Sequence, residues 1–240
     1  MPLNRDVRLT WLGHATFLVE TPGGKRLLID PWVESNPSCP PDRKDVGPCN
    51  LMLLTHAHFD HIGDAIPIAK KTGCQVVGIV ELLSWLEKKG AGNLRPMNKG
   101  GTQRFEGLDG IAVTMVHADH SCGITDGDQI LYGGEAVGYV VELENGFKLY
   151  HAGDTNVFGD MALIAELYQP DIVMLPIGDH YTMSPREAAK AVRLLDAKHV
   201  VPMHFGTFPI LTGRPSALKD LTSDIEGLTV YDIRPGETIR

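Results

Sequence analysis

The sequence predicts an α/β protein in which two mixed β-sheets pack face to face and helices cover the outside. Short apolar runs of β-favouring residues occur along most of the chain, which indicates many strands. A run of strands is followed by alternating strands and helices, and this order occurs twice. The repetition predicts two similar halves.

Length and composition fit one large soluble domain over residues 1–240. The chain has 240 residues, of which 43% are hydrophobic and 22% are charged, so it can bury a sizeable core. The formal net charge of −8 counts against a nucleic-acid partner, because phosphate binding requires a basic surface. We therefore expect a small-molecule substrate and no nucleic acid.

The termini and the cysteines indicate a cytoplasmic protein. The N-terminus has no apolar segment typical of a signal peptide, and no window is apolar for long enough to span a membrane. The four cysteines, Cys39, Cys49, Cys74 and Cys122, form no C-x-x-C pair. Reduced thiols in the cytoplasm are the preferred interpretation, with a Cys39–Cys49 disulfide as the alternative.

The first half begins with strands and then alternates. Turn residues at 21–24 and Pro31 separate the early strands, while Gly73 and Gly90 end two helices. The expected elements are strands at 7–12, 15–20 and 26–30, an irregular loop at 33–49, a strand at 51–54, a helix at 62–71, a strand at 74–78 and a helix at 80–89.

The second half repeats this order after a glycine-rich loop. Ser184 followed by Glu187 is a capping box, which predicts the start of a helix whose apolar residues share one face. The expected elements are loops at 90–110 and 121–135, strands at 111–116, 137–143, 147–150, 172–175 and 199–202, helices at 160–168 and 185–197, and a final strand pair at 229–233 and 238–240.

The segment THAHFDHIGD (55–64) contains most of the chemistry. It directly follows an apolar strand and places His56, His58, Asp60 and His61 within six residues. Imidazole and carboxylate groups are the ligands that zinc, iron and manganese accept. A solvated polar loop is the alternative, but solvation does not require His-x-His followed by Asp-His.

Three further potential ligands follow apolar strands elsewhere in the chain, namely His120, Asp154 and His204. Each has an ordinary alternative. His117 could serve instead of His120, Asp154 could cap a turn, and His204 could be a core histidine. Together with the cluster they make seven ligands, which exceeds one tetrahedral ion but suits two ions that share a carboxylate, about 3.5–4 Å apart.

These motifs resemble a known family. THAHFDHIGD resembles the H-x-H-x-D-H signature of the metallo-β-lactamase superfamily, which folds as an αββα sandwich. The ordered set GHATF, IDPW, ADHSCG, YHAGDT, LPIGDHYTMSP and VPMHFGTFP resembles small metal-dependent hydrolases related to L-ascorbate-6-phosphate lactonase. The resemblance covers nearly the whole chain and implies a metal-dependent hydrolase, in a branch whose members are often homo-oligomers.

The resemblance also implies a division of the ligands. His56, His58 and His120 would hold the first ion, Asp60, His61 and His204 would hold the second, and Asp154 would bridge them. His120 is preferred to His117 because it directly precedes Ser121, as in the family motif. A redox branch usually has Glu at the position of His58, so His58 favours hydrolysis over oxygen chemistry.

The expected reaction is hydrolysis of an ester, lactone or phosphodiester by a metal-bridging hydroxide. Zinc lowers the pKa of bound water from 15.7 to about 7, and Mn²⁺ or iron are alternatives to Zn²⁺. Asp60 would orient the nucleophile, and His14 and His151 would hydrogen-bond the ligands or protonate the leaving group. For His151 a structural role is the alternative. No role for His180 is implied, and His199 is expected to be structural.

Two other functions remain open from the sequence. A non-catalytic metal-binding or regulatory protein would keep the same ligands without turnover. A metal-dependent nuclease would also use this signature, but the acidic balance and the lack of a basic segment argue against it.

Overall fold

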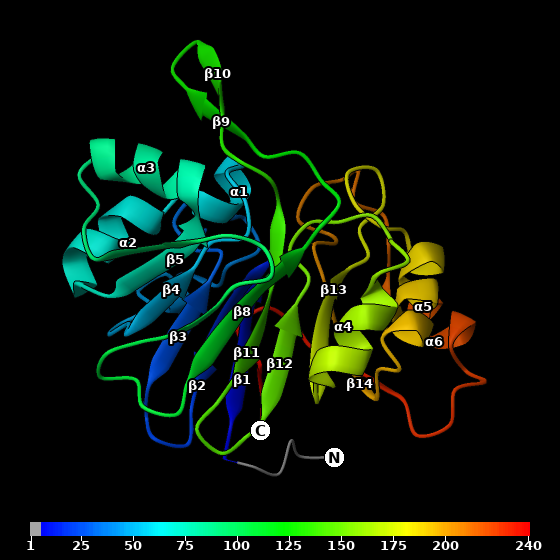
Figure 1. Cartoon of the computed structure of the whole chain (residues 1–240). Helices are drawn as coiled ribbons and strands as arrows, with labels where there is room; N and C mark the ends of the chain where they lie inside the picture. The colour runs from blue at the N-terminus through cyan, green and yellow to red at the C-terminus, as the bar shows by residue number, and fades with distance from the viewer. Residues whose placement is uncertain (1–5) are drawn as a thin grey trace.

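In the computed structural model, residues 6–240 are described, and they form two seven-stranded sheets that face each other (Figure 1). The first sheet is antiparallel from β16 to β3 and parallel from β3 to β6. Its strands, in spatial order, are β16 (Thr238–Ile239), β1 (Arg8–Gly13), β2 (Thr16–Glu20), β3 (Arg26–Ile29), β4 (Leu51–Leu53), β5 (Gln75–Ile79) and β6 (Leu94–Met97).

The second sheet has the same mixed design. It is parallel from β15 to β12 and antiparallel from β12 to β7. Its strands, in spatial order, are β15 (Thr229–Val230), β14 (His199–Met203), β13 (Ile172–Pro176), β12 (Lys148–His151), β11 (Val137–Glu142), β8 (Ala112–His117) and β7 (Thr102–Arg104). The predicted pair of mixed sheets is confirmed.

Alternation along the strands builds the core between the sheets. On β11, Val137, Tyr139 and Val141 belong to the inter-sheet core, whereas Val140 faces the helices. Fully burying one such side chain contributes about 1.5–3 kcal/mol. The buried Tyr139 hydroxyl donates to the Leu54 carbonyl, 2.7 Å away, so the second sheet is fixed to the end of β4.

Helices cover the outer faces of both sheets, as predicted (Figure 1). On the first sheet these are α2 (Ala65–Thr72) and α3 (Val80–Lys88), and on the second α4 (Met161–Tyr168), α5 (Pro185–Leu194) and α6 (Pro215–Leu221). The capping box at α5 is confirmed: the Ser184 hydroxyl accepts from the Arg186 amide, and Glu187 accepts from the Ser184 amide. Two short helical turns, η1 (Pro41–Arg43) and α1 (Phe59–Ile62), complete the set.

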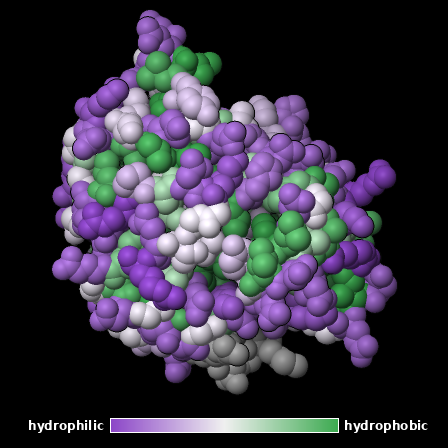
Figure 2. Space-filling model, in the orientation of Figure 1, coloured by the Kyte–Doolittle hydropathy of each residue, from purple (hydrophilic) through white to green (hydrophobic). Residues whose placement is uncertain are grey.

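A two-stranded hairpin, β9 (Gly123–Asp126) and β10 (Gln129–Tyr132), projects from the body of the molecule (Figure 1). Asp126 attaches it to α3 by accepting from the Trp85 indole and pairing with Lys89. Apolar side chains are visible on this hairpin and over α4 (Figure 2). Within the described residues, no helix combines the length and apolar character needed to cross a bilayer.

Several expectations about single elements were wrong. The predicted loops at 90–110 and 121–135 contain β6, β7 and the β9–β10 hairpin, and α6 was not predicted. The helix expected at 62–71 corresponds to α2 and begins only at Ala65, after the short α1, and α5 ends at Leu194 rather than at 197. Strands β15 and β16 do not pair with each other, because one joins the second sheet and the other joins the first. All four cysteines are free, so no Cys39–Cys49 disulfide forms.

Candidate metal centre

The potential ligands meet because strands that run in the same direction end at the same edge of the sandwich. In the first sheet β1, β3 and β4 run the same way, and in the second sheet β8, β12 and β14 do. Each of these strands is followed by polar residues: His14, Asp30, the segment His56–His61, His120, Asp154 and His204. The fold therefore positions these side chains on rigid elements from both sheets.

Three histidines form the first group. Ring nitrogens of His56, His58 and His120 lie within 4.8 Å of one another. His56 Nε2 is 3.0 Å from His58 Nδ1, and the Ser121 hydroxyl lies 3.3 Å from His58 Nε2. These are the residues expected to hold the first ion, and the structure brings them together.

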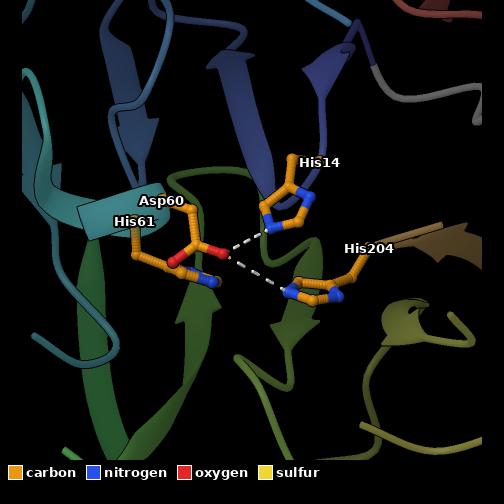
Figure 3. Close-up of side chains that lie close together, drawn as sticks. All are labelled: His14, Asp60, His61 and His204. Atoms are coloured by element: carbon orange, nitrogen blue, oxygen red, sulfur yellow. Dashed lines mark hydrogen bonds and ion pairs between the residues drawn. The ribbon is translucent and has the colours of Figure 1, made fainter. Parts of the chain in front are cut away.

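The second group consists of His14, Asp60, His61 and His204, whose ligand atoms also lie within 4.8 Å of one another (Figure 3). Asp60 Oδ2 is 2.9 Å from His14 Nε2 and 3.9 Å from His204 Nε2. The expected second set, Asp60, His61 and His204, is therefore assembled. His14 lies directly beside this set of three residues.

Asp154 lies between the two groups. Its Oδ2 is 3.9 Å from His56 Nε2 and 3.7 Å from His120 Nε2 in the first group. The same oxygen is 3.4 Å from His61 Nε2 and 3.0 Å from His204 Nε2 in the second group. A single carboxylate oxygen is thus within 4 Å of two histidines from each side.

Several buried polar atoms at this point have no hydrogen bond. Among residues 6–240, these include His61 Nε2, Asp154 Oδ1 and both ring nitrogens of His204. An unsatisfied buried polar atom costs about 1–3 kcal/mol, so such a cluster needs a partner. Divalent cations accept imidazole and carboxylate donors, and the residues present therefore fit metal ions.

Burial prepares the first group to bind a cation. It lowers the pKa of His56, His58 and His120, and neighbouring histidines add to the effect. The three imidazoles are therefore neutral near pH 7, and neutral imidazole is the form that binds metal.

The second group contains charged side chains of both signs. Burial alone would lower the pKa of His61, but Asp154 and Asp30 outweigh it and hold that pKa well above its usual range. Burial alone would raise the pKa of Asp154 and of Asp60, yet contacts with histidines keep both carboxyls ionised. Burial lowers the pKa of His14 to about 4, so its imidazole is neutral.

Asp30 supports the second group through His61. The sequence analysis did not identify it as a residue of the site. Its carboxylate accepts from the Thr55 amide and hydroxyl and lies 2.8 Å from His61 Nδ1, which leaves His61 Nε2 to face Asp154. A carboxylate behind a ligating histidine fixes the orientation of the ring. The IDPW motif contained this signal, because Asp30 also follows an apolar strand.

Strained backbone marks the same region. Asp30, His14 and His204 all have positive φ, between 49° and 57°, which is uncommon for residues other than glycine. The His204 amide donates to the His14 carbonyl, and the Thr207 hydroxyl lies 3.0 Å from His14 Nδ1. Such strain persists only where surrounding contacts hold it, and it clusters at functional sites.

The other histidines lie outside the two ligand groups. His151 is fully buried, with Nε2 3.0 Å from the Ala15 carbonyl and Nδ1 accepting from the Gly153 amide, so both ring nitrogens contact backbone. His117 is exposed and lies edge-on to Phe158. His180 is exposed beside Tyr181, and His199 lies 3.1 Å from the Tyr231 hydroxyl.

A cavity of about 550 Å³ opens over the ligands. Asp60, His120 and His204 lie in its wall together with His58 and Asp154. The remaining lining residues were not identified from the sequence, because a lone aromatic or polar loop residue has no periodic signal. They are Phe59, Ser121, Thr125, Tyr181, Phe208 and Ile210.

Comparison with known proteins points to one family. Residues 25–205 match the model of the beta-lactamase superfamily domain. A UPF0173 metal-dependent hydrolase of Koribacter versatilis is 59% identical over 234 residues, which is 98% of each chain. A relative of the same description from Solibacter usitatus is 50% identical, over 98% of this chain and all of the other.

Solved structures agree. Igni18, described as a novel metallo hydrolase from Ignicoccus hospitalis, superposes with a TM-score of 0.85 at 36% identity, over 97% of both chains. Zn²⁺-bound PqqB from Methylobacterium extorquens, at 16% identity, shares the fold with a TM-score of 0.63, over 94% of this chain and 86% of that one.

Proposed function

This chain belongs to the beta-lactamase superfamily, among its metal-dependent hydrolases, and we propose that it is a hydrolase that works with two divalent metal ions. His56, His58 and His120 would hold the first ion, while Asp60, His61 and His204 would hold the second. Asp154 would bridge them. The bond cleaved is an ester, lactone or phosphodiester.

The position of Asp154 carries this proposal. One of its oxygens lies within 4 Å of histidines from both groups, although those histidines come from different strand ends. A carboxylate shared by two ions needs this placement. The orphaned nitrogens of His61 and His204 beside it support the same interpretation.

The ions would supply the nucleophile at neutral pH, because a bound water has its pKa lowered from 15.7 to about 7. The protein residues position the reaction. Asp60 is ionised and faces the cavity, so it can accept a hydrogen bond from the attacking water. His14, neutral and 2.9 Å from Asp60 Oδ2, donates from Nε2 and accepts from Thr207 at Nδ1, which fixes the Asp60 carboxylate.

His151 is assigned a positioning role within this proposal. Its Nδ1 accepts from the Gly153 amide and therefore holds the turn that precedes Asp154. His151 does not line the cavity over the ligands, so we do not assign leaving-group protonation to it. A structural role was the alternative for His151 in the sequence analysis, and it is the role that we propose.

Zinc is the metal that we propose for both positions. Histidines with a few carboxylates are typical zinc ligands, and Mn²⁺ or iron accept the same donors. We also propose that the protein works in the cytoplasm, because its four cysteines are all free and buried, as expected in a reducing compartment. A homo-oligomer stays a prediction.

Hydrolysis assays with matched variants test the proposal. Zinc-loaded protein is expected to hydrolyse members of a panel of 4-nitrophenyl esters, lactones and phosphodiesters, and chelator should abolish the activity. Asp60→Ala and His120→Ala are each expected to lower kcat/KM at least 100-fold, because each removes a ligand. His117→Ala is the control, since His117 is an exposed histidine three residues away that contacts Phe158 instead.

The same assays separate the enzyme from a non-catalytic metal-binding protein. If metal-loaded protein hydrolysed nothing in the panel, the proposed hydrolase would be contradicted. If His117→Ala and His120→Ala lost activity equally, the assignment of His120 as a ligand would be contradicted. Nuclease activity is disfavoured because no Lys or Arg of the described residues 6–240 lines the cavity. Single-stranded RNA and DNA are included in the panel as the direct check.

A further inference from the structure

The part of the cavity lining that lies beyond the metal ligands is largely apolar. Phe59 comes from α1, Tyr181 from the loop before α5, and Phe208 and Ile210 from the loop after β14. Phe59, Tyr181 and Ile210 remain 64%, 58% and 45% exposed. Large apolar side chains gathered at the mouth of a cavity are typical of a ligand site rather than of ordinary surface.

Neighbouring rings hold part of this wall in place. The Trp32 ring lies 5.8 Å from Phe59 and 5.9 Å from Phe208. Phe208 also meets the edge of the His14 ring at 5.7 Å. Phe59 and Phe208 therefore belong to one group of packed rings that includes His14, the side chain that supports Asp60.

The lining beyond the metal ligands offers no positive side chain to an anionic group of the substrate. Among residues 6–240, the lining contains no Lys or Arg, and its polar side chains beyond the metal ligands are Ser121, Thr125 and Tyr181. Arg214, in the loop that carries Phe208 and Ile210, instead donates to carbonyls of that loop. A phosphate or carboxylate away from the reacting bond would meet no cationic side chain of the lining.

We propose that the substrate is a carboxylic ester or lactone whose acyl part is uncharged and apolar, and that Phe59, Tyr181, Phe208 and Ile210 bind that part. This inference rests on the proposed hydrolase function and narrows its substrate class. A cavity of about 550 Å³ accommodates a molecule of ordinary small-ligand size. In this proposal the Ser121 and Thr125 hydroxyls, which also line the cavity, would hydrogen-bond the alcohol part.

The reaction is an ordinary hydrolysis and needs no further reactant. The oxygen of water bonds to the carbonyl carbon, and the bond between that carbon and the alkoxy oxygen breaks. One proton of the water passes to the departing alkoxide. The products are a carboxylic acid and an alcohol, or a hydroxy acid when the substrate is a lactone.

A chain-length series measures the apolar contact. For 4-nitrophenyl esters from acetate to octanoate, corrected for their alkaline hydrolysis rates, we expect kcat/KM to rise by up to about fourfold per added methylene until the cavity is filled. Mono-4-nitrophenyl adipate has the length of the hexanoate but ends in a carboxylate, and its kcat/KM should be at least tenfold lower. Bis(4-nitrophenyl) phosphate should be a poorer substrate than the hexanoate.

Matched variants locate the contact. Tyr181→Ala and Ile210→Ala are expected to flatten the chain-length dependence and to raise KM for the octanoate more than they lower kcat. Tyr132→Ala and Ile130→Ala replace the same residue types at exposed positions of β10, 72% and 80% exposed, and should leave the series unchanged. A flat series in the wild type, or equal effects of both variant pairs, would overturn the substrate class while leaving hydrolysis intact.

A binding measurement keeps the two proposals separable. Calorimetric titration of the zinc-loaded protein with hexanamide and with 6-amino-6-oxohexanoate compares an apolar chain with an anionic one, without turnover of an ester. Tighter binding of hexanamide, lost in Tyr181→Ala but not in Tyr132→Ala, supports the apolar site even if no ester is hydrolysed. Hexanamide binding that is equally strong in the wild type and in Tyr181→Ala contradicts it.

Discussion

Asp30 shows how single residues behind the ligands control the site. It is fully buried, and its carboxylate has two polar contacts with Thr55 and one with His61. The Thr55 hydroxyl in turn lies 3.0 Å from His56 Nδ1. One carboxylate therefore orients a histidine of the second group directly and one of the first group through a hydroxyl. Removing its charge should weaken metal binding without removing a ligand.

Substitution of Asp30 by Asn tests this role. The amide has nearly the same shape but is neutral, so it orients His61 less strongly, and the affinity for the second metal ion should fall about 10–100-fold. Competitive titration with a zinc indicator measures the change. Asp45→Asn, at an exposed carboxylate that pairs with Lys71, is the control and should have wild-type affinity. Equal affinities for all three proteins would show that Asp30 does not orient the site.

At the scale of elements, the ends of the central strands could be predicted from the sequence, whereas the edge strands of the two sheets could not. The apolar runs before His56, His120, Asp154 and His204 correspond to β4, β8, β12 and β14, because central strands bury both faces and read as continuous apolar segments. The ligand groups followed from these ends together with the family resemblance. The roles proposed for the ligands and for His14 and His151 still stand as predictions.

The elements missed or misplaced are mostly at the sheet edges. β6, β7, β15 and β16 are the edge strands of the two sheets, and each has four residues or fewer. β6 contains Pro96 and β7 is polar, as edge strands often are, so neither shows an alternating pattern. The last two strands were expected to form a pair, but β15 pairs with β14 and β16 pairs with β1. The pairing of these two strands cannot be predicted from the residues next to them in the sequence.

Gly178, between β13 and α5, lies so close to His204 that a larger residue would not fit there. A Cβ on Gly178 would lie 2.0 Å from the His204 carbonyl oxygen. Gly178→Ala should therefore displace His204, lower the midpoint of thermal unfolding and weaken zinc binding at least tenfold. Gly159→Ala is the control, because a Cβ there meets no atom within 4 Å. Calorimetric melting and zinc titration measure both effects, and unchanged zinc binding in Gly178→Ala would contradict the account.

At the scale of the molecule, the two sheets are connected at both ends. Near the site, the Val137 amide donates to the Thr55 carbonyl. At the opposite end, Glu144 in the β11–β12 turn accepts from the Thr21 hydroxyl and the Gly23 amide in the β2–β3 turn. The site is built from both sheets, so contacts that fix their relative position also fix the distance between ligand groups.

The Glu144 contact predicts a pH dependence of stability. Burial alone would raise the pKa of Glu144, but the hydrogen bonds from Thr21 and backbone amides lower it below the usual 4.5. Its contribution is therefore present above about pH 4.5 and is lost as the pH falls through the lowered pKa. Because the group is partly exposed, Glu144→Gln should reduce the free energy of unfolding at pH 7 by only roughly 1 kcal/mol.

Urea unfolding at several pH values measures this effect. The difference between wild type and Glu144→Gln should be constant from pH 5.5 to pH 7.5 and should shrink at more acidic pH. Glu226→Gln, at an exposed position, should match the wild type throughout. A difference that grew on acidification would have the wrong sign for a carboxylate whose pKa is lowered by folding.

Metal analysis tests the central claim of a two-ion site bridged by Asp154 most directly. Protein purified without chelator, and the same protein stripped and reconstituted with zinc, should be analysed by mass spectrometry for metal per chain. Close to two zinc ions per chain are expected in the wild type, and Asp154→Ala should retain fewer than one because both groups lose their shared ligand. One ion or none at saturation in the wild type would contradict the account.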